Sequence, residues 1–136
     1  MLIKIVDNID LNEAYAYLQS PVSGAVNLFV GTVRNHSHDK EVIKLVFEAY
    51  EAMALKEMHK IAETAQSRWQ LDRVVVIHAV GEKQPGEAVV ITGASSVHRK
   101  ASFEACQFLI DELKKTVPIW KHEFFKDNSV WVNAHP

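Results

Sequence analysis

The residues best suited to chemistry in this sequence are cations that gather in its second half. Positions 98 to 126 hold six Lys or Arg residues against four Asp or Glu residues, whereas the whole 136-residue chain has a formal charge of −2. Guanidinium and ammonium groups are the protein groups that most often bind phosphate and carboxylate. The pattern predicts a pocket in which Arg34, Arg99, Lys114 and Lys121 bind a small anion such as a phosphate ester.

Two of these cations flank a proline. Lys114 lies near the end of a helical pattern that Pro118 stops, and Lys121 lies in the apolar run that follows. If that run folds back, both ammonium groups reach one site, where a lysine crowded by other cations can act as a base or nucleophile. The alternative is structural, with Lys114 paired to Asp111 and Lys121 paired to Glu123.

A second candidate anion site lies where a predicted strand meets a helix, in the run Ser95-Ser96-Val97-His98-Arg99. Free amides at a helix start favour an anion, and His98 and Arg99 lie beside them. In the alternative, Ser96 only caps the helix and Arg99 is a surface residue.

The remaining histidines and the single cysteine are predicted to be structural. His36 and His38 could bind a metal, but they lie in a polar loop without cysteine, and we expect no metal site. His78 falls in an apolar run and is predicted to be a core histidine. Cys106, the only cysteine, has apolar helical neighbours and is predicted to be an inert, buried thiol.

Side-chain periodicity predicts the elements that must position these groups. Apolar residues at steps of three and four indicate helices, and alternating or β-branched runs indicate strands. The predicted helices cover residues 11–18, with Asp10 as N-cap, 51–69 and 97–117. The predicted strands cover residues 2–6, 25–33, 44–50, 73–80, 88–95, 119–125 and 130–133. The order β-α-β-β-α-β-β-α-β-β indicates the α+β class with a largely antiparallel sheet.

Length and composition set the wider expectations. A chain of 136 residues is expected to form a single domain over residues 1–136. Its near-neutral charge argues against electrostatic binding to nucleic acid or to a membrane surface. No stretch approaches the roughly 18 apolar residues of a membrane span, and the start is unlike a signal peptide. With one cysteine and no possible internal disulfide, we expect a cytoplasmic protein.

Four segments together resemble a known family, the large, catalytic subunit of molybdopterin synthase. The resemblance runs from Gly24 to Trp131, and its most specific parts are the VRN, HR and PxWKxE elements at their mutual spacing. The segments are GAVNLFVGTVRNH, RWQLDRVVVIHAVGEKQPGE, SSVHRKASFEA and LKKTVPIWKHE.

The resemblance implies an enzyme of molybdenum cofactor biosynthesis with an α/β-hammerhead-like fold. It implies a sulfurtransferase that converts cyclic pyranopterin monophosphate (precursor Z) to molybdopterin and needs no cofactor of its own. The sulfur donor would be the C-terminal Gly-Gly thiocarboxylate of a small ubiquitin-like subunit. Two large subunits would form a homodimer within a heterotetramer. Since Cys106 is predicted to be buried, sulfur supplied by a partner agrees with the residues.

The resemblance also implies residue roles. Lys114 and Lys121 would be catalytic. The substrate-binding residues would be Thr32, Val33, Arg34, His98, Arg99, Lys114, Lys121, His122 and Glu123.

Two other functions fit the same cations. One is a non-catalytic dimeric α+β module that binds a phosphorylated small molecule, which would keep the basic pocket without needing both lysines. The other is a phosphate-ester hydrolase with His98 as acid and base, for which the sequence offers no nucleophile or metal that we can place.

Overall fold

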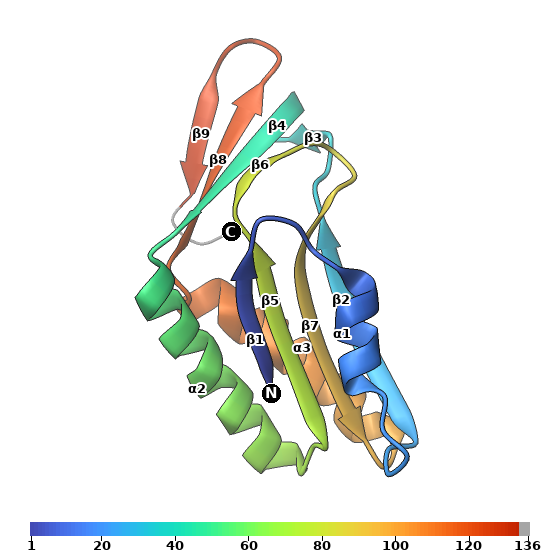
Figure 1. Cartoon of the computed structure of the whole chain (residues 1–136). Coiled ribbons are helices and arrows are strands. Elements are labelled where there is room, and N and C mark those ends of the chain that lie inside the picture. The colour runs from blue at the N-terminus through green and yellow to red at the C-terminus, as the bar shows by residue number, and fades with distance from the viewer. Residues whose placement is uncertain (134–136) are drawn as a thin grey trace.

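The computed structural model describes residues 1–133, and residues 134–136 of the expected domain lie outside the described part. Three helices and nine strands make up these residues (Figure 1). In chain order they are β1 (Leu2–Val6), α1 (Leu11–Leu18), β2 (Ala25–Thr32), β3 (His36–Ser37), β4 (Lys40–Ala49), α2 (Glu51–Trp69), β5 (Arg73–Ala79), β6 (Gly81–Lys83), β7 (Ala88–Ser96), α3 (Arg99–Thr116), β8 (Ile119–Phe125) and β9 (Val130–Asn133).

A four-stranded sheet in the order β1-β5-β7-β2 carries the main core. Strand β1 is parallel to β5, and the other neighbours are antiparallel. Along β5, Val74 and Val76 belong to the core cluster formed with α2 and α3, whereas Val75 and Ile77 pack with residues of α1. Because helices cover both faces of the sheet, β5 is apolar along nearly its whole length rather than alternating.

The second sheet combines strands from before and after α3. Its strands follow the order β3-β4-β8-β9, and β6 also pairs with β4 (Figure 1). Helix α3 ends at Thr116, and Pro118 cannot continue it because its ring fixes φ and it has no amide hydrogen. Strand β8 then turns back to pair with β4, with Lys121 opposite Phe47.

Buried leucines fix the end of α3 against the sheets. Leu109 and Leu113 are fully buried in the larger core cluster. Burying a leucine side chain contributes about 2–3 kcal/mol. This packing fixes the last turn of α3, which carries Lys114, relative to the strands.

The predicted α+β class and the mostly antiparallel pairing are confirmed. The strands form two sheets, and two short strands were not predicted, because β3 and β6 are only two and three residues long and show no periodicity. Strand β4 begins at Lys40, inside the segment predicted as a loop.

The two predicted helix caps have different outcomes. Asp10 caps α1 by accepting a hydrogen bond from the Glu13 amide at 3.2 Å. The prediction for Ser96 was wrong: Ser96 ends β7, its hydroxyl donates to the His98 carbonyl at 2.6 Å, and His98 is the N-cap residue of α3. Within residues 1–133, no helix combines the length and the apolar character needed to cross a membrane.

Candidate active site

The two lysines predicted to meet across Pro118 do so. Both line two adjoining hollows, which also share Thr32 and Leu45. We call them the apolar hollow, of about 100 Å³, and the polar hollow, of about 140 Å³. A group bound in either hollow would lie beside the ammonium groups of Lys114 and Lys121.

The apolar hollow reaches inward between the two sheets and α3. Its polar groups are those of Thr32, His78 and the two lysines. Its apolar wall is formed by Phe29, Leu45, Phe47, Val89, Val90, Ile110 and Leu113, with Gly31 beside them. Such a slot favours a narrow, weakly hydrated group that ends near the lysines.

The polar hollow lies on the other side of the lysines. Arg34, His36, Ser37 and Glu123 line it together with Val42 and the shared residues. Three cations therefore face one carboxylate, an arrangement that suits an anionic ligand. Thr32 and Arg34 line hollows as the sequence-based role requires.

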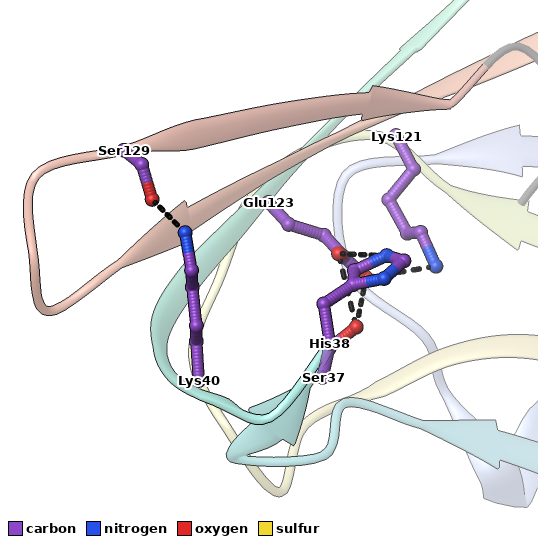
Figure 2. A network of polar contacts seen from close by, with 6 residues as sticks. All are labelled: Ser37, His38, Lys40, Lys121, Glu123 and Ser129. Atoms are coloured by element: carbon purple, nitrogen blue, oxygen red, sulfur yellow. Dashed lines mark hydrogen bonds and ion pairs between the residues drawn. The ribbon is translucent and has the colours of Figure 1, made fainter.

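Lys121 is held by a buried carboxylate. Its Nζ lies 3.1 Å from Oε1 of Glu123, whose side chain is 5% exposed (Figure 2). The Ser37 hydroxyl donates to Oε2 of Glu123 at 3.1 Å, and Nε2 of His38 lies 3.6 Å from the same oxygen. The ion pair considered as the structural alternative for Lys121 is present, and it lies inside the site. It fixes the position of this ammonium group.

Lys114 has a different environment. Among the ion pairs and hydrogen bonds found within residues 1–133, none involves Lys114, so its alternative pairing with Asp111 was wrong. The lysine follows the last buried turn of α3 and faces both hollows. A lysine without a carboxylate partner is free to contact a ligand.

His78 is a site residue that the sequence reasoning missed. It is 2% exposed, as expected of a core histidine, yet it lines the apolar hollow. Burial lowers the pKa of His78 to about 4, and the charge of Lys114 adds to this effect. The sequence did contain a signal, the alternation of side chains along β5: position 78 lies on the same face as Val74 and Val76, which belong to the larger core cluster.

Two predicted binding residues do not line either hollow. Val33 lies in the core at 4% exposure, and its amide and carbonyl bond to Glu87 and Gly86. His122 alternates with Lys121 and Glu123 along β8, and its Nε2 lies 3.9 Å from Oε1 of Glu48. Neither side chain contacts the hollows in one chain.

His98 and Arg99 lie at the opposite end of α3 from the lysines. Both are exposed, and fifteen residues separate Arg99 from Lys114. At 1.5 Å per residue this is about 22 Å along the helix axis. Within one chain the pair therefore does not converge with Lys114, Lys121 and Arg34.

The predicted burial of Cys106 is confirmed. Its thiol is 3% exposed and donates to the Thr92 carbonyl at 3.3 Å. Burial raises the pKa of this thiol, so its reactive thiolate form is disfavoured. Within residues 1–133, no group of three or more His, Cys, Asp or Glu side chains is placed to hold a metal ion.

Comparison with known proteins identifies the family. The family model described as "MoaE protein" matches residues 5–116. The molybdopterin synthase catalytic subunit of Pyrococcus abyssi is 36% identical over 133 residues, covering 98% of this chain and 90% of that protein. The crystal structure of molybdopterin synthase from Staphylococcus aureus superposes with a TM-score of 0.91 at 28% identity, covering 97% of this chain and 96% of that one.

A further solved structure contains two kinds of subunit. It is the protein–protein complex of subunits 1 and 2 of the molybdopterin-converting factor from Helicobacter pylori. The TM-score is 0.76 at 26% identity, and the match covers 98% of this chain and 93% of that one. Family model, relatives and fold all agree, and the chain belongs to the MoaE family, the catalytic subunits of molybdopterin synthase.

Proposed function

We propose that this chain transfers sulfur from a small carrier subunit to a pterin phosphate, with one reactant in each hollow. The polar hollow takes the anionic cyclic pyranopterin monophosphate, and the apolar hollow takes the C-terminal thiocarboxylate of the carrier. The observation that carries the proposal is that Lys114 and Lys121 line both hollows. Reactants bound in the two hollows meet at these two ammonium groups.

The charge of the polar hollow supports its assignment to the phosphate. Arg34 offers a planar guanidinium, which binds phosphate oxygens in pairs. Arg34, Lys114 and Lys121 outnumber the single carboxylate of Glu123, which Lys121 and Ser37 already occupy. The hollow therefore keeps a cationic surplus for a ligand.

The narrowness of the apolar hollow supports its assignment to a glycine tail. A Cβ built on Gly31 would lie 2.5 Å from Cγ1 of Val90, so a side chain at this lining position would force Val90, another lining residue, to shift. An extended Gly-Gly segment has no side chains to exclude. The two-subunit complex from Helicobacter pylori supports a small partner for this family.

The lysines suit the acyl chemistry of such a transfer. The donor sulfur attacks a pterin side-chain carbon, and the carbon–oxygen bond at that carbon breaks, with its electron pair leaving on the oxygen. Water then adds to the acyl carbon, which now carries the pterin on its sulfur, and an oxyanion forms. The carbon–sulfur bond of the carrier then breaks, its electron pair stays on the sulfur, and the carrier leaves as a carboxylate. Lys121, held by Glu123, stabilises the oxyanion, and Lys114 moves the proton of the attacking water.

His98 and Arg99 take part through a second copy of the chain. Strand β2 lies at a sheet edge, where Val26 and Phe29 are exposed, and Phe103 of α3 shares a groove with Phe29. Pairing of two chains over this apolar surface would bury it beside the apolar hollow, which Phe29 also lines. In such a homodimer the His98–Arg99 pair of one chain can serve the substrate of the other.

Reconstitution tests this function. The chain is mixed with the pterin phosphate and a small subunit carrying a C-terminal thiocarboxylate, and sulfur incorporation is counted by mass spectrometry. We expect two sulfurs per pterin, and none when the small subunit ends in a plain carboxylate. A folded sample that binds the pterin without incorporating sulfur would contradict the proposal and favour the non-catalytic binding module.

A further inference from the structure

The ring of His78 has one nitrogen that is hydrogen-bonded and one that has no hydrogen-bond partner among residues 1–133. Its Nδ1 lies 2.7 Å from the carbonyl oxygen of Ala79. A carbonyl oxygen can only accept, so Nδ1 carries the hydrogen and donates. In the neutral ring Nε2 is then an acceptor with a free lone pair.

The free nitrogen opens into the apolar hollow. Within residues 1–133, no buried side-chain nitrogen or oxygen lacks a hydrogen-bond partner. Nε2 has no hydrogen-bond partner among these residues, so it cannot be one of the buried atoms and must be accessible. The hollow that His78 lines provides that access. Phe47 packs edge-on against the ring at 5.1 Å and limits its rotation.

The surroundings keep this acceptor neutral. The ring is buried among apolar side chains, and Lys114 lines the same hollow. Both the burial and the nearby positive charge of Lys114 disfavour protonation of the imidazole. Lys121 also lines this hollow, but its charge is paired with the carboxylate of Glu123. A neutral acceptor in an otherwise apolar wall gains most from a neutral N–H donor.

We propose that His78 is a ligand-binding residue of the apolar hollow, whose Nε2 accepts a hydrogen bond from a backbone amide of the carrier tail. The assignment rests on the proposed function, which puts that tail in this hollow. A glycine amide fits because it brings a donor without a side chain. A ring N–H of the pterin has the same chemistry, and the experiment separates the two sources.

The test measures binding without turnover. Dissociation constants are measured for wild type, His78→Phe and His78→Gln with three ligands. These are the complete small subunit, a small subunit lacking its last two glycines, and the pterin phosphate. Phe keeps a flat ring without nitrogens, whereas the Gln side-chain oxygen can still accept. His59, which is exposed on α2, provides the matched control His59→Phe.

We expect His78→Phe to raise the dissociation constant of the complete small subunit about tenfold. This is the change expected when one hydrogen bond to a buried acceptor is lost. The truncated subunit should bind wild type and His78→Phe equally, and His78→Gln should recover most of the loss. Thermal unfolding of each variant confirms that binding is measured on folded protein.

Three results would overturn the inference. They are equal weakening for both forms of the small subunit, no weakening for either, and a loss seen only as a higher dissociation constant for the pterin. This experiment measures binding and not sulfur transfer. A weaker binding that depends on the tail would therefore support the role of His78 even if the reconstitution gave no sulfur transfer, so failure of one proposal can be told from failure of the other.

Discussion

Lys121 and Lys114 line the same two hollows, yet their surroundings differ. Lys121 pairs at 3.1 Å with the buried carboxylate of Glu123, which Ser37 also binds. Lys114 has no ion pair within the described residues and shares the apolar hollow with the neutral ring of His78. The comparison teaches that one residue type can supply two functions when an ion pair holds one copy in place and the other copy has no such pair within the described residues.

The largest expected effect comes from removing the free lysine. Lys114→Ala should lower the rate of sulfur incorporation at least about a hundredfold, since the proposed function places this group at the reacting atoms. The free energy of unfolding should stay within about 0.5 kcal/mol of wild type, because the side chain is exposed and has no ion pair within residues 1–133. Single-turnover kinetics and urea unfolding measure the two quantities.

Lys121→Ala gives the other half of this test. It should also lower the rate strongly, but it leaves Glu123 without its cation and should destabilise the fold by about 1–3 kcal/mol. Equal stability losses in the two alanine variants would contradict the difference drawn between the lysines.

The next effect concerns the carboxylate that fixes Lys121. Glu123→Gln keeps an acceptor for Ser37 but removes the negative charge, so Lys121 is no longer held in place. We expect the rate to fall about tenfold and the free energy of unfolding to fall by about 1–3 kcal/mol. Ser37→Ala is the matched control, since it removes a hydrogen bond and leaves the ion pair. A Glu123→Gln variant with wild-type turnover would show that the pair has no role in the reaction.

A smaller effect follows from the neutral histidine beside Lys114. The pKa of His78 is lowered from 6.5 to about 4, so between these values the unfolded chain binds a proton that the folded chain excludes. The contribution to stability is fully present above pH 6.5 and is lost as the pH falls through 4. Between pH 7 and pH 5 it should amount to about 2 kcal/mol. Urea unfolding at both pH values should show this loss in wild type, and a smaller loss in His78→Gln. An identical pH slope in both proteins would mean that His78 is not held neutral.

The smallest effect is expected at the thiol. Cys106→Ala should keep sulfur incorporation within about twofold of wild type, because the thiol is buried and bonded to Thr92. In native wild type, Cys106 should react with a thiol reagent only as fast as the protein unfolds. Rapid labelling, or a large loss of sulfur transfer, would give this thiol a chemical role and weaken the comparison of the lysines.

Local pattern predicted the helices and the long strands because each buries a periodic apolar face. Helix α2 and strands β1, β8 and β9 have the predicted bounds. Pairing over long sequence distances was harder to predict. Nothing around Leu45 in the sequence indicates that β4 pairs with both β6 and β8.

The same limit applies to the site. The joining of Lys114 and Lys121 was predictable because Pro118 dictates a local reversal. Alternation along β5 indicated the face on which His78 lies. Its position in one hollow with Lys114 depends on tertiary packing of the sheet and α3, which no local pattern indicates. The separation of Arg99 from Lys114 follows from the length of α3 and could have been calculated from the predicted helix.

That length has a kinetic consequence. An unbroken helix is a stiff spacer, so α3 keeps its two cationic ends apart in every isolated molecule. If the His98–Arg99 end of one molecule serves the lysine end of another, a symmetric pair completes two sites at once and a lone molecule completes none. Specific activity should then decline on dilution, and mixing chains that carry Arg99→Ala with chains that carry Lys114→Ala should restore part of the lost turnover.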